Sequence, residues 1–352
     1  MDKFREWDLQ KDIHQYECYA KKCTNVTPYH LVEYLLAEEK AEEGWTKIFL
    51  YEDNGKFALL PQVVRKINSL PYMQELEKNE YDMIAPHEYG GIIGNTNERA
   101  VMRGLLENIL AYCKANHIIF QFIRINPYMK ELPFIYEENG YELIHSNSHV
   151  YVNLKQTEEQ IIGDYKSNVR RNVKRAEKEG LTFKIAEKTH INANIFKELY
   201  QKAMEILEAR RFLYFNDEYF QALIKCNCSR LGIVQNQEGK IIAAAVMLLD
   251  EDIVYYHLGC FDRDYKLQRP MNYLMHSMIL WSKRNGYRTF HLAGGSKSLM
   301  QFKTGYSSTR VDYYIANQIC DKKRYNNICS MWKSKFPEFA DEQYYPLYRY
   351  NE

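Results

Sequence analysis

The sequence predicts a mixed α/β fold built from two copies of one unit in tandem. Two observations carry this prediction: a β-hairpin signal occurs twice along the chain, and each time a strand, an amphipathic helix and a further strand follow it. A chain of 352 residues is comfortable for two domains. We therefore expect an N-terminal domain over residues 1–147 and a C-terminal domain over residues 148–352.

The first copy starts at KIFLYEDNGKFALLPQVV, Lys47 to Val64, where two apolar runs flank an Asn-Gly turn. The stretch YDMIAPHEYGGIIG then predicts a short strand that ends in glycines. Apolar residues at helical spacing between Val101 and Cys113 predict a helix, and IIFQFIRINP predicts the strand that closes the unit.

The second copy starts at RLGIVQNQEGKIIAAAVMLL, Arg230 to Leu249, where two apolar runs again flank a turn. DIVYYHLGC predicts the next strand and YRTFHLAGG the last one. Between them, Pro270 suits the first turn of a helix and Gly286 its C-cap. The predicted helix has one apolar face, formed by Met271, Leu274, Met275, Met278 and Ile279.

Composition limits the classes to which the protein can belong. The formal net charge is +1, so bulk charge does not indicate nucleic acid binding, although a local patch still could. The N-terminus is polar, and no apolar run approaches the roughly 18 to 20 residues of a transmembrane helix. The 8 cysteines are scattered without a CxxC pair, which predicts no metal site. Together these features predict a cytoplasmic protein.

The repeated order of hairpin, strand, helix and strand is that of the GNAT acyltransferase fold. Three stretches resemble the FemABX aminoacyltransferases: the basic NVRRNVKRAEKEGLTF, the strand–helix–strand from YYHLGC to HLAGG, and SLMQFKTGYSS. The last resembles the family's Phe-Lys-x-Gly-Phe segment, with Tyr306 in place of the final Phe. In the first copy, APHEYGGIIG and FIRINP look like a related branch of bacterial surface-polysaccharide acyltransferases. The resemblance covers roughly residues 45 to 325, and the coiled-coil arm of some members has no counterpart here.

The resemblance implies tandem GNAT-like domains and an N-acyl transfer. Members of the family use aminoacyl-tRNA to add amino acids to the peptide of a peptidoglycan precursor. The implied partners are therefore aminoacyl-tRNA, as a co-substrate without a further cofactor, and a lipid-linked or nucleotide-linked muropeptide. A lipid-linked acceptor would bring the protein to the membrane surface. Such a reaction needs a neutral amine, stabilisation of the oxyanion and compensation of the donor's phosphate charge.

Lys303 and Tyr256 are the predicted catalytic residues. Lys303 follows the last strand of the second copy, from where its ammonium could reach the reacting carbonyl, and the resemblance places the family's transfer-site lysine there. The alternative is an ordinary solvated lysine. Alternation along the strand directs Tyr256 to one face and its neighbours Tyr255 and His257 to the other. His257 could act as a general base or be a packed core histidine.

The predicted substrate-binding residues fall into three groups, apart from Phe302, which precedes Lys303. Positive charges recur along one face of the basic helix, a pattern that suits a tRNA backbone or a nucleotide diphosphate but is also typical of a solvated face. The stretch ARRFLYF interleaves arginines with aromatics, and the resemblance places it along the acceptor groove. The third group lies at the strand ends of the first copy and includes Glu88 and Tyr89 as weaker candidates. The residues assigned to substrate binding are Lys166, Arg170, Lys174, Arg210, Arg211, Tyr214, Phe302 and Arg124.

Two other functions remain open at this point. GNAT enzymes that use acyl-CoA bind its pyrophosphate on a glycine-rich turn before the central helix, but the corresponding QRPMNYL and GNTNERAV lack that pattern. An acyl-CoA-dependent enzyme acting on an amino sugar is thus the alternative. A non-enzymatic binding module is the other alternative, and the presence of the Lys303 segment argues against it. The aromatic C-terminal tail from Met331 is expected to pack on its own, C-terminal domain.

Overall fold

The chain divides into two compact units in the computed structural model, which describes residues 2–342 and 344–350. The first unit comprises Met1–Ser146, Arg210–Phe212 and Tyr313–Glu352, and the second comprises Asn147–Ala209 and Leu213–Asp312. The predicted C-terminal domain, residues 148–352, is therefore too long. From Tyr313 onwards the chain belongs to the first unit, because its strand pairs there.

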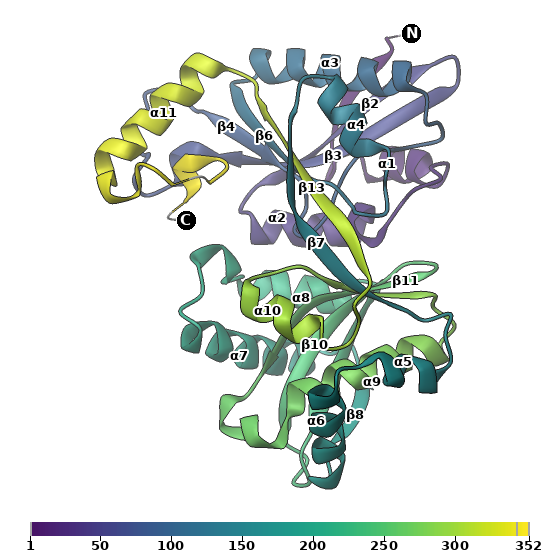
Figure 1. The fold of residues 1–352 in the computed structure, drawn as a ribbon. Coiled ribbons are helices and arrows are strands. Elements are labelled where there is room, and N and C mark those ends of the chain that lie inside the picture. The colour runs from purple at the N-terminus through teal and green to yellow at the C-terminus, as the bar shows by residue number, and fades with distance from the viewer. Residues whose placement is uncertain (1, 343, 351–352) are drawn as a thin grey trace. The chain divides into compact units, whose positions relative to one another are not determined.

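The sheet of the first unit has the strand order β1-β2-β3-β4-β6-β13, with the short β5 paired to β3 (Figure 1). Only the pair β4 and β6 is parallel among the strand pairs described for this unit. The strands are β1 (Phe4–Asp8), β2 (Trp45–Asp53), β3 (Lys56–Lys66), β4 (Tyr81–Ile84), β5 (Ile93–Gly94), β6 (Ile118–Arg124) and β13 (Arg310–Ile319).

The hairpin predicted around the Asn-Gly pair is confirmed as β2 and β3. Asp53 pairs with Lys56, so Asn54 and Gly55 form a two-residue turn. Both have positive φ, 51° and 76°. A type I′ turn requires this conformation, which asparagine and glycine adopt more readily than other residues.

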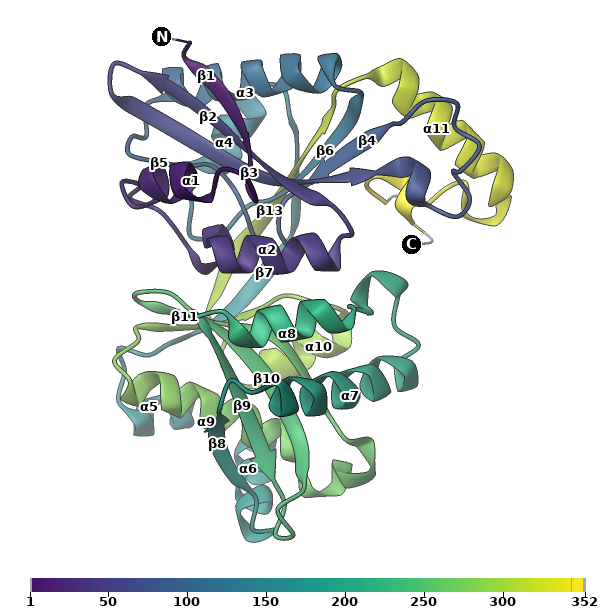
Figure 2. The ribbon, with the colours of Figure 1, turned by 180° about the vertical axis from the view of Figure 1, so that it is seen from behind.

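Helices cover both faces of this sheet (Figure 2). Phe49 of β2 packs against α3, whereas its neighbours Ile48 and Leu50 lie with α1 and α2 on the other face, as strand alternation requires. The helices of the first unit are α1 (Ile13–Ala20), α2 (Val32–Ala41), α3 (Arg99–Ala115), α4 (Leu132–Glu138) and α11 (Lys322–Lys335).

The C-terminal tail packs on the first unit, so the expectation that it covers the C-terminal domain was wrong. Trp332 of α11 and Tyr348 are fully buried in one cluster with Ile119 and Phe120 of β6. These strand residues are apolar and need a cover on their face of the sheet. Gln343, Asn351 and Glu352, also part of the predicted tail, lie outside the described residues.

A buried ion cluster fixes the tail to the sheet. The Asp82 carboxylate accepts hydrogen bonds from Arg349 Nε at 2.5 Å and Arg65 Nε at 2.9 Å, and from the Tyr348 hydroxyl at 3.1 Å. Burial alone would raise the pKa of Asp82, but Arg349 and Arg65 outweigh burial and hold this pKa below its ordinary value. The carboxylate therefore stays ionised in the core.

The second unit repeats the arrangement of the first. Its strand order is β7-β12-β11-β10-β9-β8, and the parallel pair β11 and β12 flanks helix α9 in the chain as β4 and β6 flank α3. This confirms the predicted tandem duplication of a mixed α/β unit. The strands are β7 (Glu142–Asn153), β8 (Thr182–Ala186), β9 (Ser229–Gln235), β10 (Ile241–Leu249), β11 (Ile253–Phe261) and β12 (Thr289–Ala293).

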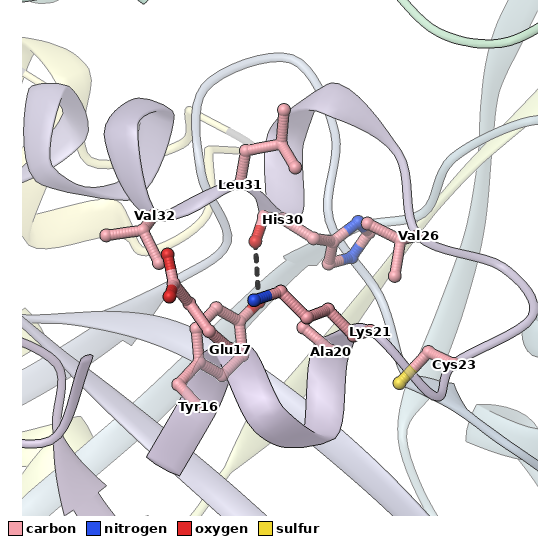
Figure 3. A pocket seen from close by; sticks show the side chains of 9 residues that line it. All are labelled: Tyr16, Glu17, Ala20, Lys21, Cys23, Val26, His30, Leu31 and Val32. Atoms are coloured by element: carbon pink, nitrogen blue, oxygen red, sulfur yellow. Dashed lines mark hydrogen bonds between the residues drawn. The ribbon is translucent and has the colours of Figure 1, made fainter. Parts of the chain in front are cut away.

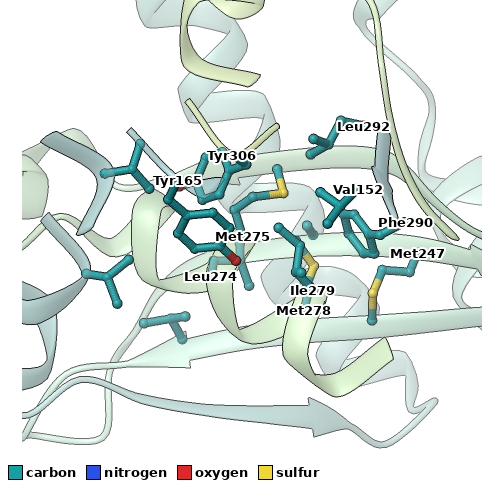
Figure 4. Packing of buried hydrophobic residues seen from close by; sticks show 14 of the residues in the cluster. Val152, Tyr165, Met247, Leu274, Met275, Met278, Ile279, Phe290, Leu292 and Tyr306 are labelled. Carbon is teal, nitrogen blue, oxygen red and sulfur yellow. The ribbon is translucent and has the colours of Figure 1, made fainter. Parts of the chain in front are cut away.

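The core of the second unit forms where α9 lies on the sheet (Figure 4). Leu274, Met275, Met278 and Ile279 of α9 are fully buried against strand residues such as Phe290. The apolar helix face predicted from the sequence is thus confirmed. Helix α9 spans Pro270–Arg284, and the other helices are α5 (Glu158–Asp164), α6 (Ser167–Lys178), α7 (His190–Ile206), α8 (Asp217–Lys225) and α10 (Lys297–Lys303).

Replacing Asp82 with asparagine should strongly destabilise the first unit. Asp82→Asn removes the buried carboxylate that faces Arg65 and Arg349, which costs about 3–5 kcal/mol of unfolding free energy. The Asp53→Asn variant is the control: it breaks an ion pair with Lys3 at the surface, which is worth less than about 1 kcal/mol. Urea denaturation measures both values, and equal losses would contradict the role given to the cluster.

The sign of the pH dependence follows from the lowered pKa of Asp82. The cluster contributes stability above the ordinary aspartate pKa, and this contribution is lost as the pH falls through the lower folded value. We expect the acid-side loss of stability to be smaller in Asp82→Asn than in the wild-type protein.

Candidate active site

The parallel strands of the second unit part from each other after three residues. β11 and β12 pair only from Ile253 with Thr289 to Tyr255 with His291. β11 continues along β10 as far as Phe261, with a bulge at His257. In open α/β sheets, ligands bind beyond the carboxyl ends of parallel strands. Tyr256, the first residue after the strands part, therefore stands at the expected place for a site.

The backbone at the end of β12 is held in an unusual conformation. Ala293 has φ of 60° and Gly295 has φ of 138°. Positive φ costs a non-glycine residue such as alanine about 1–3 kcal/mol and persists only where the surroundings require it. Ser296 then caps α10 through the backbone N–H of Leu299, and this helix ends at Lys303.

Lys303 is buried, which contradicts the alternative of an ordinary solvated lysine. Its side chain is 6% exposed, and Nζ donates a hydrogen bond to the carbonyl oxygen of Gly294. The same nitrogen lies 5.5 Å from the centre of the Tyr256 ring. A cation attracted by a ring face and a carbonyl is held in one place. The structure therefore brings the two predicted catalytic residues together.

Two buried histidines lie beside Lys303, and sequence reasoning missed both. Burial first, and the Lys303 ammonium second, lower the pKa of His149 to about 3. Burial, His149 and Lys303 also lower the pKa of His291 well below its ordinary value. Their rings are 5.5 Å apart. At neutral pH both imidazoles are uncharged, and the positive charge here is on Lys303.

Gly294 leaves no room for a side chain. A Cβ atom there would lie 2.6 Å from Cδ2 of His149 and 2.9 Å from Oδ1 of Asn147. This Oδ1 is buried and has no hydrogen-bond partner within the described residues. The fold explains the need for a glycine here, since β7 with His149 pairs directly with β12.

Phe302 and the basic helix contribute differently from what was expected. Phe302 is half-buried with its ring 5.3 Å from Tyr306, so it packs inwards. On α6, Arg170 donates hydrogen bonds to the carbonyl oxygens of Gly163 and Tyr165. The predicted row of charges is therefore interrupted at Arg170. Lys166 and Lys174 remain exposed, as an interaction with phosphate requires.

The stretch ARRFLYF is exposed at the residues that were predicted to bind substrate. The guanidinium of Arg210 lies 4.9 Å from the centre of the Tyr350 ring and 5.8 Å from that of Tyr344. Arg211 begins a short 3₁₀ helix, and Tyr214 is 40% exposed. The tyrosine contacts distinguish Arg210 from Arg211. The binding roles of all three residues stay predictions.

The remaining predicted positions lie on β11, at the end of β6 and in the loop after β4. His257 is 5% exposed and forms a hydrogen bond of 3.0 Å with the hydroxyl of Tyr219, as a packed histidine does. In the first unit, Arg124 ends β6 and donates a hydrogen bond to the Ala85 carbonyl oxygen. Glu88 has φ of 71°, and Tyr89 is buried.

A pocket of about 320 Å³ lies in the first unit and shares no residue with the Lys303 cluster (Figure 3). The Tyr16 hydroxyl donates to the carbonyl oxygen of His30 on its wall. Its lining is mainly apolar, and it is formed by Tyr16, Glu17, Ala20, Lys21, Cys23, Val26, His30, Leu31 and Val32. Burial raises the pKa of Cys23 to about 12, so its thiol is a poor nucleophile at neutral pH.

No group of three or more His, Cys, Asp or Glu side chains in residues 2–342 and 344–350 is placed to hold a metal ion. Within the same part of the chain, no helix is both long and apolar enough to span a bilayer.

Residues 163–304 match the family model of the acetyltransferase (GNAT) domain. The match contains Tyr256 and Lys303, whereas Asn147 and His149 precede it. Residues 163–304 form a GNAT acyltransferase domain. No curated protein sequence matches the chain.

Solved structures share the fold of the whole chain. A crystal structure of FemX has a TM-score of 0.66 at 14% identity and covers 92% of this chain and 99% of its own. L-PGS from Bacillus licheniformis has a TM-score of 0.59 at 15% identity, covering 90% and 95%. A tandem GNAT protein from the clavulanic acid biosynthesis pathway has a TM-score of 0.54 at 8% identity, covering 90% and 98%. Residues 163–304 thus carry an acyltransferase domain, and the whole chain has the fold of a tandem GNAT protein.

A methyl group at position 294 should disturb the site. In Gly294→Ala the new Cβ overlaps the buried ring of His149, so we expect a loss of about 1–3 kcal/mol in unfolding free energy. We also expect a displacement of the carbonyl oxygen at position 294, which accepts the hydrogen bond from Lys303. Gly163→Ala is the matched control, because a Cβ there meets nothing within 4 Å. Urea denaturation of both variants measures the difference. A Gly294→Ala protein as stable as Gly163→Ala would contradict the tight packing.

Proposed function

We propose that the protein transfers an amino acid from aminoacyl-tRNA to an amine of a peptidoglycan precursor peptide, with no cofactor beyond this co-substrate. The observation that carries the proposal is the buried Lys303, held between Gly294 and Tyr256 at the point where β11 and β12 part. The likeness in fold to FemX and L-PGS supports it. The acceptor would be a lipid-linked or nucleotide-linked muropeptide.

The reaction replaces an ester by an amide. The neutral amine of the acceptor attacks the ester carbonyl carbon, a C–N bond forms, and the carbonyl oxygen becomes negative. Collapse of this intermediate breaks the C–O bond to the tRNA ribose, and the proton lost from the amine is taken up at the leaving oxygen. The Lys303 ammonium is suited to stabilise the developing negative charge, because burial strengthens its electrostatic effect.

The neighbours of Lys303 support the same role. Gly294 O and the Tyr256 ring hold its ammonium in place before the substrates arrive, so little reorganisation is needed at the moment of reaction. His149 and His291 are neutral and therefore do not add a second positive charge there. The exposed Lys166 and Lys174 of α6 would contact tRNA phosphates, and Arg210, Arg211 and Tyr214 the acceptor.

Acyl-CoA is the alternative donor, with an amino sugar as acceptor. The structure of the tandem GNAT protein from the clavulanic acid biosynthesis pathway is one without AcCoA, and this link between a similar fold and AcCoA gives the alternative its support. Against it, α9 begins at Pro270 after Arg269, without the glycines that bring backbone N–H groups to a pyrophosphate.

Label transfer to the acceptor tests the proposal. Purified protein is incubated with tRNA charged with labelled amino acids and with a muropeptide precursor, with and without RNase. We expect label on the precursor, none after RNase treatment, and a loss of at least about 100-fold in rate in Lys303→Met, the size expected when one oxyanion donor is removed. Lys297→Met, an exposed lysine on the same helix, is the control and should keep full activity.

The other outcomes are equally informative. Full activity in Lys303→Met would contradict the role of that lysine. Absence of label from charged tRNA, together with turnover of an acyl-CoA on an amino sugar, would replace the proposed donor by the alternative. Binding of none of these ligands would indicate a non-enzymatic module.

A further inference from the structure

Arg124 is a partly buried cation, and one hydrogen bond from its guanidinium, which has five N–H donors, is described. Its Nη1 donates to the Ala85 carbonyl oxygen at 3.0 Å, and its guanidinium lies 5.0 Å from the centre of the Phe122 ring. No described carboxylate lies within 4.0 Å of this guanidinium. The Nε and Nη2 donors have no partner in the described residues and are not sealed from solvent. These two parallel N–H groups form the fork that binds carboxylate or phosphate.

The loop next to Arg124 is strained. The chain leaves β4 after Ile84 and returns to β6 at Gly90, whose N–H donates to the Arg124 carbonyl oxygen at 2.7 Å. Between them, Glu88 has φ of 71° although it is not glycine. Strain of this kind costs about 1–3 kcal/mol and occurs preferentially at ligand sites. Arg124 lies just beyond the ladder of the parallel strands β4 and β6, which ends with Ile84 opposite Phe122, as Tyr256 lies just beyond the ladder of β11 and β12.

The charge of Arg124 acts on a buried carboxyl group, that of Glu38. Glu38 of α2 is 0% exposed; its Oε2 accepts a hydrogen bond from the backbone N–H of His87, and its Oε1 has no partner in the described residues. Burial, and then Glu42, raise the pKa of Glu38 to about 8, against opposing effects of the His87 N–H, Arg124 and Tyr34. At neutral pH this carboxyl group is therefore protonated in most molecules.

Two of the other titratable groups around Arg124, His87 and Tyr313, are uncharged at neutral pH. Burial lowers the pKa of His87 to about 3, so its imidazole is neutral. Burial raises the pKa of Tyr313 on β13, which therefore keeps its proton. Glu42, one turn beyond Glu38, is paired with Arg65 at 2.6 Å. Glu88 is the remaining acidic group nearby, and its carboxylate lies 3.6 Å from His87.

We propose that the Nε and Nη2 edge of Arg124 binds an oxyanion of the acceptor, a carboxylate or a phosphate, and that Glu38 must be protonated for tight binding. Ionised Glu38 would place a negative charge next to Arg124, which would repel the oxyanion and compete for the guanidinium. Binding is then coupled to proton uptake, so affinity falls as the pH rises through the pKa of Glu38. The identity of the ligand rests on the proposed function.

Calorimetric titration of the full chain tests the site without using the transfer reaction. The probes are a muropeptide stem peptide ending in a free carboxylate, the same peptide as its C-terminal amide, and uridine diphosphate. We expect the peptide with the free carboxylate, or uridine diphosphate, to bind at pH 6.5. Arg124→Gln should weaken this binding by about 10- to 100-fold, as for loss of hydrogen bonds to a charged group. Arg124→Lys keeps the charge and loses the two parallel N–H groups, so its affinity should lie between those of the wild type and Arg124→Gln. The control Arg103→Gln changes an exposed arginine and should bind like wild type.

The pH arm tests Glu38. Between pH 6.5 and 9.5 the wild-type affinity should fall by roughly tenfold, and in Glu38→Gln, which cannot ionise, it should stay level. Circular dichroism confirms that each variant is folded.

Each result bears on the inference. Peptide binding that the amide abolishes identifies the carboxylate, and uridine diphosphate binding identifies a phosphate. Absence of binding by all three probes, or equal binding by Arg124→Gln, would overturn the site, and equal pH dependence in Glu38→Gln would overturn its coupling to Glu38. Arg124-dependent binding in a protein that fails to transfer label would leave this site standing while the proposed function fails.

Discussion

The structure around Lys303 depends on the hydrogen bond from its ammonium to the Gly294 carbonyl oxygen. A buried ammonium is costly unless an acceptor meets it, so β12 has to end with a carbonyl group turned towards α10. The positive φ of Ala293 is part of that turn. The residue that offers the carbonyl must also lack a side chain, because His149 fills the space where a Cβ would stand. The same lysine helps to keep His149 and His291 uncharged.

The two units share a backbone plan but differ in the charge at the strand ends. In the second unit, Lys303 comes ten residues after Ala293, the last residue of β12. Ten residues after Arg124, the last residue of β6, stands Phe134, which is 54% exposed. The helix that follows β6, α4, ends at Glu138, whereas α10 ends at Lys303, and the first unit instead has a guanidinium on the strand itself. In a duplicated fold of this kind the two copies can have different functions, one suited to the proposed acyl transfer and the other to binding an anion.

Local sequence signals predicted the elements well, whereas contacts between distant segments could not be predicted. The Asn54-Gly55 turn and the apolar face of α9 depend on neighbours in the chain, and both were confirmed. Lys303 was found because it follows a strand end. His149 was missed because its role arises only when β7 pairs with β12, about 140 residues later in the chain. For the same reason, the aromatic residues of the tail did not reveal which unit they would cover.

The start of α9 bears on the choice of donor. A CoA pyrophosphate needs bare backbone N–H groups at a helix N-terminus, but here the first turn carries side chains. The Asn272 amide donates to the Tyr306 hydroxyl at 3.0 Å, and that hydroxyl donates back to the Asn272 carbonyl oxygen at 3.2 Å. Tyr306 lies three residues after Lys303, so these bonds connect the lysine segment to the helix. A tRNA needs no such cradle, because long cations contact its phosphates from exposed surfaces. Under the proposed function, the exposed Lys174 of α6 and Lys166 at its N-cap would meet that need, and α6 packs beside α9.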